Sequence, residues 1–315
     1  MLARIDPLVR LLIAATVLAL VLPVRGEARA VAQVISNAAV FLLFLLNGLR
    51  LPRHEVVAGM GNHRLLWPLI GWVFGIMPAL GWLLWRGGQG MIEPLIALGF
   101  LYLGCLPSTV QSATAYCSLA GGNVASSVVA AALLNILGVF VSAPLFSTLG
   151  GAGGAAFDTG ALVKVVGILL VPFVIGQILQ DRLGGAVRAH RRLATAMDRT
   201  TIAIAVYVAL SGAVIQRFWT RVEPEGWIAL ALGVAAMLLV AHFGAWLLGG
   251  ALRLARGDRI AFLFAGAQKS VAMGAPLAAV LFAPDRAGVI LLPLLIYHLA
   301  QLVLAAPLAG RLNRR

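Results

Sequence analysis

Two stretches decide the fold that this sequence predicts: Leu106-Pro107-Ser108-Thr109-Val110-Gln111-Ser112 and Gly266-Ala267-Gln268-Lys269-Ser270. Each places polar side chains in the middle of a long apolar run. Proline removes a backbone donor from a helix, and freed backbone groups cannot be left facing lipid. We therefore expect a broken helix at each stretch, facing protein or a wet cavity, with Pro107, Gly266 and Pro276 as the residues that break it.

The composition around these stretches is that of a membrane protein. Of the 315 residues, 61% are apolar and 11% are charged, against about 25% charged in a typical soluble domain. A helix that spans a bilayer needs roughly 20 apolar residues. Ten spans account for nearly the whole chain and leave no room for a soluble domain: 8–24, 30–49, 66–85, 94–120, 124–149, 160–180, 199–218, 226–250, 260–283 and 288–310.

The two interrupted spans are the fourth and the ninth, so they hold the same place in two sets of five. An odd number of spans per set inverts the second set in the membrane. Proline and glycine are common in membrane helices, but interrupted helices at matching positions of inverted repeats indicate a transporter site. We predict an all-α polytopic membrane protein with repeats at residues 1–150 and 151–315 and discontinuous, crossing helices four and nine.

Basic residues are distributed unevenly between the predicted loops. Sixteen of the 24 Lys and Arg residues fall on the side that holds both termini, and six fall on the other side. Cytoplasmic loops carry this excess, so we predict that both termini are cytoplasmic. As a default rather than from the charge count, we place this integral membrane protein in a bacterial inner membrane. The same rule accounts for the net charge of +13 without a nucleic-acid partner. The predicted partners are the lipid bilayer and a small organic anion.

The first thirty residues allow a second interpretation. Arg4 and Arg10, an apolar run at 11–22 and Ala28-Arg29-Ala30 also resemble a signal peptide with its cleavage site. Cleavage there would leave nine spans and would disrupt the repeat. A mature N-terminus at Val31 would identify this alternative.

The predicted membrane interior contains a lysine and no carboxylate, because all eleven Asp and Glu residues lie in loops or at span ends. A charged lysine at the bilayer centre costs roughly 2.5–3.5 kcal/mol on insertion scales, so Lys269 needs a partner or a cavity. It could attract an anionic substrate, stand where a sodium ion would bind, or release a proton during transport. The alternative is a structural tether to carbonyls of the broken fourth span.

Three further polar residues are candidates. His298 and Gln301 share a helix face, where the histidine could relay protons or simply pack with its ring bonded to a carbonyl. Asn135 could join neighbouring helices by hydrogen bonds.

The interrupted stretches, together with Gly122-Asn123-Val124 and Leu292-Pro293-Leu294-Leu295-Ile296-Tyr297-His298, resemble the bile acid:sodium symporter superfamily and its SBF-like branch. The resemblance covers nearly the whole chain. It implies ten helices in a core and a panel domain, with the fourth and ninth crossing. It also implies carriage of organic anions, often driven by sodium. The sequence itself suggests no soluble cofactor.

Residue by residue, the resemblance is incomplete at the sodium sites. Gln111 and Ser112 fall near a Ser-Asn pair of sodium-driven members, and Ser127 matches a serine of the fifth helix. Gln268 matches a glutamine, but Lys269 takes the place of the following asparagine, and the preceding glutamate is absent. An ammonium repels a second cation a few ångströms away, so this comparison identifies no metal site and argues against a sodium ion here. Coupling to sodium and coupling to protons are both left open.

We predict a carrier that binds its organic anion at the crossing, using hydrogen bonds and the charge of Lys269. The predicted site comprises Ser108, Thr109, Gln111, Ser112, Ser127, Asn135, Gln268, Lys269, Ser270, His298 and Gln301. The alternatives are a membrane regulator or scaffold that has lost transport, and an intramembrane enzyme. The enzyme alternative lacks a nucleophile with its base: Lys269 and Ser270 are adjacent, so their side chains diverge on a helix.

Overall fold

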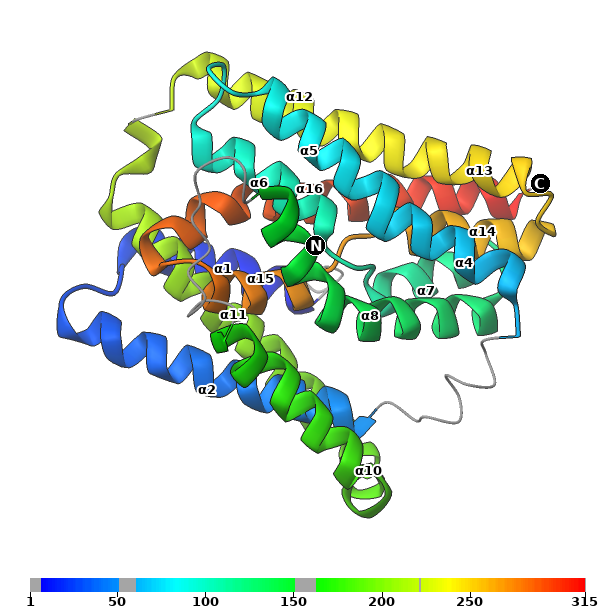
Figure 1. The fold of residues 1–315 in the computed structure, drawn as a ribbon, viewed down its shortest axis with the longest axis horizontal. Coiled ribbons are helices and arrows are strands. Elements are labelled where there is room, and N and C mark those ends of the chain that lie inside the picture. The colour runs from blue at the N-terminus through cyan, green and yellow to red at the C-terminus, as the bar shows by residue number, and fades with distance from the viewer. Residues whose placement is uncertain (1–6, 51–60, 151–162, 221, 315) are drawn as a thin grey trace. The chain divides into compact units, whose positions relative to one another are not determined.

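The computed structural model describes residues 7–50, 61–150, 163–220 and 222–314. These residues are helical almost throughout and contain no β-strand, only two isolated β-bridges (Figure 1). Seven helical runs within them are long and apolar enough to cross a membrane: Glu27–Arg50, His63–Gly87, Val124–Gly150, Val163–Ala189, Arg191–Ile215, Pro224–Ala251 and Pro284–Asn313. The all-helical membrane fold is therefore confirmed.

The other three predicted spans contain shorter helices. Span 8–24 holds α1, Pro7–Val21. Span 94–120 is divided into α6, Pro94–Cys105, and α7, Val110–Leu119. Span 260–283 is divided into α14, Arg256–Ala267, and α15, Val271–Leu281. The chain leaves the helical conformation at 106–109 and at 268–270, so each half is too short to cross a bilayer alone.

Only one of the three predicted helix breakers lies in a break. Pro107 follows Leu106, which is extended with ψ 147°. Gly266 lies inside α14, where an added Cβ would come within 2.9 Å of Cδ1 of Trp72, so this glycine makes room for an indole. Pro276 lies inside α15, where it removes one backbone donor without ending the helix. The prediction that Gly266 and Pro276 break the helix is wrong.

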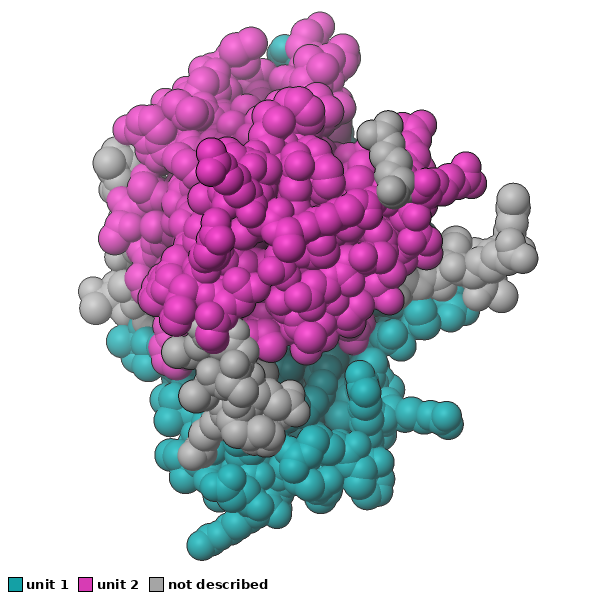
Figure 2. All heavy atoms as spheres, turned by 90° about the vertical axis from the view of Figure 1, so that its right-hand side faces the viewer, with its two compact units in different colours: residues 1–52, 154–223, 274–292 teal, residues 53–153, 224–273, 293–315 magenta. Residues whose placement is uncertain are grey.

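The chain forms two compact units, coloured separately in Figure 2. Unit 1 comprises residues 1–52, 154–223 and 274–292, and unit 2 comprises residues 53–153, 224–273 and 293–315. Each unit takes chain from both of the predicted repeats. The long helix α16, Pro284–Asn313, begins in unit 1 and ends in unit 2.

Unit 1 is built on α1, α2 (Glu27–Arg50), a π-helical turn (Val166–Leu170), α10 (Val171–Ala189) and α11 (Arg191–Ile215). Helices α2 and α10 cross closely (Figure 1), because Gly48 of one and Gly176 of the other lie against each other's backbone. Arg50 forms a bidentate pair with Asp198, with N–O distances of 2.5 and 2.8 Å. Helix α1 packs on α11, and cleavage after Ala30 would remove that contact.

Unit 2 contains α4 (His63–Gly71), a π-helical turn (Trp72–Ile76), α5 (Met77–Gly87), α6, α7, α8 (Val124–Gly150), α12 (Pro224–Leu239), a second π-helical turn (Val240–Gly244), α13 (Ala245–Ala251) and α14. Residues 96–105 of α6 and 260–267 of α14 are buried on every side. A helix that is apolar all round belongs in an interior. The carboxyl ends of both half-helices therefore lie inside the unit, where their last carbonyls need partners.

Candidate functional site

The two helix breaks lie side by side within unit 2. Ser108 and Lys269 form an antiparallel bridge, and the backbone N–H of Ser270 donates to the carbonyl of Pro107 over 3.1 Å. The backbone groups that the breaks release are thus partly satisfied by each other, as an interior without water requires. The structure brings together the two stretches that the sequence singles out.

The ammonium of Lys269 lies at the carboxyl end of α6. It donates to the carbonyl of Gly104 over 2.9 Å and to that of Leu106 over 2.6 Å. Its side chain is 0% exposed, and it is the only Lys, Arg, Asp or Glu in the described residues that is fully buried. The predicted tether to the broken fourth span is the arrangement that the structure contains. The positive charge faces the negative end of a helix dipole.

Helix α16 supports the second break through hydrogen bonds from the side chain of Gln301. The side-chain oxygen of Gln301 accepts from the backbone N–H of Lys269 over 2.7 Å, and its amide nitrogen donates to the carbonyl of Lys269 over 3.0 Å. The same nitrogen lies 2.8 Å from Nδ1 of His298. His298 therefore belongs to the support of the break, through Gln301, and both side chains are buried.

The amino ends of α7 and α15 differ in their capping. The hydroxyl of Ser270 accepts from the backbone N–H of Met273 over 3.2 Å and so caps α15, as serine does at this position. Thr109 holds the corresponding position of α7 and makes no side-chain cap. The first backbone N–H groups of α7 thus lack a side-chain acceptor and carry the positive end of the helix dipole.

Two buried polar groups near this open helix end have no hydrogen-bond partner: the hydroxyl of Ser108 and the amide nitrogen of Gln268. The oxygen of Gln268 accepts from the hydroxyl of Ser112, in the first turn of α7, over 3.0 Å. Asn135 of α8 donates to the carbonyl of Ser108 over 2.8 Å. A buried donor without an acceptor costs about 1–3 kcal/mol, which favours a ligand that supplies one.

The remaining predicted residues contribute less directly. Gln111 lies in the first turn of α7 with an exposed side chain, and Thr109 is half-buried. Ser127 is buried in the first turn of α8, two turns before Asn135, and takes no part in the hydrogen bonds described above.

Sequence reasoning missed Tyr297, and it described the partners of Lys269 only as carbonyls of the broken fourth span, without identifying their residues. The hydroxyl of Tyr297 donates to the carbonyl of Ala267 at the end of α14 over 2.8 Å, as Lys269 does at the end of α6. Its position beside His298 was the available signal. The carbonyls of Gly104 and Leu106 leave no trace in the sequence, because every residue has one.

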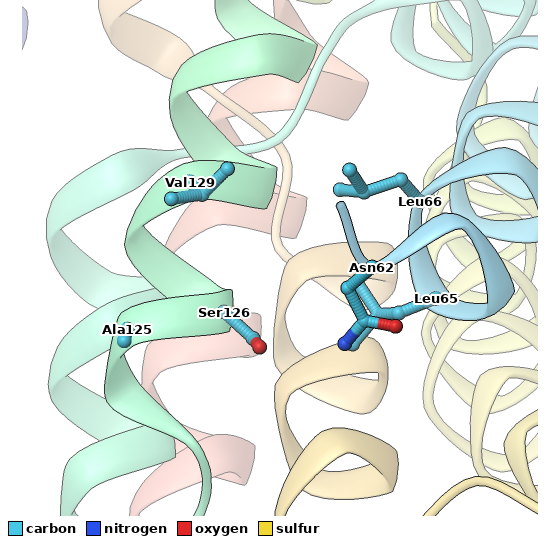
Figure 3. Close-up of a pocket in the computed structure, with 6 residues that line it drawn as sticks. All are labelled: Asn62, Leu65, Leu66, Ala125, Ser126 and Val129. Carbon is cyan, nitrogen blue, oxygen red and sulfur yellow. The ribbon is translucent and has the colours of Figure 1, made fainter. Parts of the chain in front are cut away.

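A hollow of about 150 Å³ lies in unit 2 outside the breaks, between α4 and α8 (Figure 3). It is lined by Asn62, Leu65, Leu66, Ala125, Ser126 and Val129. Asn62 donates to Asp258 over 3.1 Å and Asn123 donates to the same carboxylate over 2.8 Å. The carboxylate therefore ties together the ends of α4, α8 and α14, and no residue predicted for the site lines this hollow.

The sequence profile of the SBF-like CPA transporter family matches residues 6–314. The chain belongs to this family. It is 35% identical over 321 residues to "Putative symporter YfeH" of Escherichia coli, covering 99% of this chain and 94% of the relative. It is 37% identical over 308 residues to "Uncharacterized protein PA2026" of Pseudomonas aeruginosa, covering 96% and 92%.

More distant relatives of this SBF-like chain include "Sodium/bile acid cotransporter 7" of the mouse, 25% identical over 280 residues, which are 87% of this chain and 82% of the relative. The predicted resemblance is thus confirmed. The SBF-like CPA family is a family of transporters, so the expectation that the protein is not an enzyme is also confirmed.

Proposed function

We propose that this protein is a secondary carrier of a small or amphipathic organic anion, which binds where α7 begins beside the second break. The carrier has ten transmembrane helices in two inverted repeats and lies in a bacterial inner membrane. It exposes its site to each side in turn by rocking one group of helices against the other, as repeat-built transporters do.

The observation that carries this proposal is the unfilled group of donors at the start of α7. The amide nitrogen of Gln268 and the hydroxyl of Ser108 are buried and lack partners, and no side chain caps the adjacent helix end. Helix amino ends and free donors favour an anion.

The charge around the breaks has the sign that an anion needs. Lys269 contributes one positive charge, and residues 94–120 and 260–283 contain no Asp or Glu. Each helix end contributes about half a charge, positive at the two amino ends and negative at the two carboxyl ends, so these four cancel. The net charge of the region is then that of Lys269, which acts on the cargo through its field because the ammonium itself is occupied by carbonyls.

The same charge argues against sodium as a required partner. A sodium ion at the crossing would lie a few ångströms from the ammonium, and like charges at this distance repel strongly in an interior of low dielectric constant. We propose that anion binding is the same in sodium and in potassium.

The test is the thermal stability of the purified protein with a panel of monocarboxylates, dicarboxylates, sulfonates and bile acids, in NaCl and in KCl. We expect at least one anion to raise Tm equally in both salts. At one hundred times its Kd, a ligand that binds only the folded state stabilises it by about 2.7 kcal/mol.

Gln268→Leu removes the unpartnered donor and should raise the Kd for that anion at least tenfold. Gln89→Leu, which changes an exposed residue outside the breaks, is the matched control and should bind as the wild type does. No stabilising anion, equal binding by Gln268→Leu, or stabilisation that requires sodium would contradict the proposal. Counterflow of the bound anion in proteoliposomes separates a carrier from a regulator that binds without transport.

A further inference from the structure

The carbonyls at the end of α6 form a place for a cation. The carbonyls of Gly104 and Leu106 both point to one atom, Nζ of Lys269, at 2.9 and 2.6 Å. They belong to the last turn and the first extended residue of a buried half-helix, where intrahelical donors run out. In transporters, unwound carbonyls and carboxyl ends of half-helices are the groups that coordinate monovalent cations.

The ammonium of Lys269 is held at these two carbonyls because the backbone of Lys269 is itself fixed. The N–H and C=O of Lys269 are both bonded to the side chain of Gln301, and the residue pairs with Ser108 in the antiparallel bridge. Its side chain is among the largest in the described residues that are completely buried. Because the ammonium is covalently tethered next to the two carbonyls, its effective concentration there is high.

The occupant also fills the place in the way that a free ion would. An ammonium and an alkali cation carry the same charge, and both take carbonyl oxygens as partners. Among the described residues, the ammonium forms no salt bridge, and the groups that it contacts directly are two backbone carbonyls. A cation of the same charge without the covalent tether would satisfy the same oxygens.

We propose that the end of α6 is a monovalent-cation site whose resident ligand is the ammonium of Lys269. Removing this side chain opens the site to a free cation, either a short alkylammonium or an alkali metal ion. The wild-type protein then needs no added cation to hold its first break. This inference deepens the sodium-independent carriage proposed above, but its test involves no anion and no transport.

The experiment compares wild type and Lys269→Ala, each purified and heated in NaCl, in KCl, in N-methylglucamine chloride and in n-propylammonium chloride at one ionic strength. We expect the wild-type Tm to be the same in all four salts. The Tm of Lys269→Ala should be lowest in N-methylglucamine, which is too large for the space left by one side chain. It should rise saturably with n-propylammonium, and with sodium or potassium.

Lys269→Met is the matched control, because its side chain fills much of the same space without a charge. We expect it to lose stability and to show no response to any cation. A Lys269→Ala variant as stable as wild type in N-methylglucamine would overturn the proposal, because the carbonyls would then need no cation. Equal cation responses of Lys269→Ala and Lys269→Met would also overturn it, because the response would not come from the vacated space.

A Lys269→Ala variant that does not fold in any of the salts, n-propylammonium included, would likewise count against the proposal. The site would then accept no free cation. If the anion panel fails while the cation response of Lys269→Ala appears, the inferred site stands and only the proposed cargo is wrong. If an anion raises Tm but the cation response of Lys269→Ala is absent, the proposed cargo stands and the inferred cation site is wrong.

Discussion

At the scale of single residues, the breaks are held by side chains that act on backbone groups. Lys269 donates to a carbonyl at the end of α6, and Tyr297 donates to a carbonyl at the end of α14. Ser270 accepts from a backbone N–H at the start of α15. Gln301 differs from these because it bonds both the N–H and the C=O of one residue, as a neighbouring strand would. Interior backbone groups need partners, so these four side chains replace the helical hydrogen bonds that the breaks remove.

Gln301→Ala removes both hydrogen bonds to Lys269 and leaves two buried backbone groups without partners. We expect the free energy of unfolding to fall by about 1–3 kcal/mol for each unsatisfied group, measured by thermal or denaturant unfolding of the purified protein. The control, Gln89→Ala, alters an exposed glutamine and should change stability by no more than about 0.5 kcal/mol. Equal stability of the two variants would mean that the break does not depend on Gln301.

At the scale of helices, close crossings depend on glycine. In unit 2, a Cβ on Gly81 of α5 would come within 2.5 Å of the carbonyl oxygen of Phe100, and one on Gly104 of α6 within 2.6 Å of that of Met77. In unit 1, Gly176 of α10 packs in the same way on the backbone of α2. Small residues let membrane helices approach closely enough for van der Waals packing to hold them together.

Gly176→Ala inserts a methyl group against the backbone of α2 and should force α2 and α10 apart. We expect a loss of stability of about 1–3 kcal/mol, the usual cost of overpacking, read as a lower Tm of the purified protein. Gly185→Ala lies on the same helix with no atom within 4 Å of the added Cβ, so it should be neutral or slightly stabilising. A Gly185→Ala variant that loses as much as Gly176→Ala would refute a role for the crossing.

At the scale of the whole molecule, the chain returns repeatedly between two compact units, each of which takes segments from both predicted repeats. The basic residues follow a different division, with sixteen of the 24 on the side predicted for the termini. This asymmetry is the only observation here that orients the protein in the membrane, through the tendency of Lys and Arg to stay cytoplasmic.

Reporter fusions test that orientation. Alkaline phosphatase fused after Gly61, in the predicted loop between spans 30–49 and 66–85, should be inactive because that side is predicted to be cytoplasmic. The same enzyme fused after Gly90, past the next span, should be active, and green fluorescent protein fused to the C-terminus should fluoresce. An active phosphatase after Gly61 together with an inactive one after Gly90 would invert the proposed topology.

Much of the fold could be predicted because helix formation and membrane insertion depend on local sequence. Apolar runs located the helices, and the stretches around Pro107 and Gln268 located both interruptions to within a few residues. The local signals failed at Gly266 and Pro276, where glycine serves the packing of Trp72 and proline is accepted inside a helix. A residue that is able to break a helix does so only if the tertiary structure satisfies the exposed backbone groups.

By itself, the sequence determined the fold class, the positions of the two interruptions and the lysine without a membrane carboxylate. Only the tertiary structure decided what Lys269 does, because its partners are carbonyls of Gly104 and Leu106, more than 160 positions away. The same holds for the open end of α7, where the hydroxyl of Ser270 caps one half-helix and Thr109 leaves the other uncapped. Residue type sets which bonds a side chain is able to make, but distant chain segments set which of them are within reach.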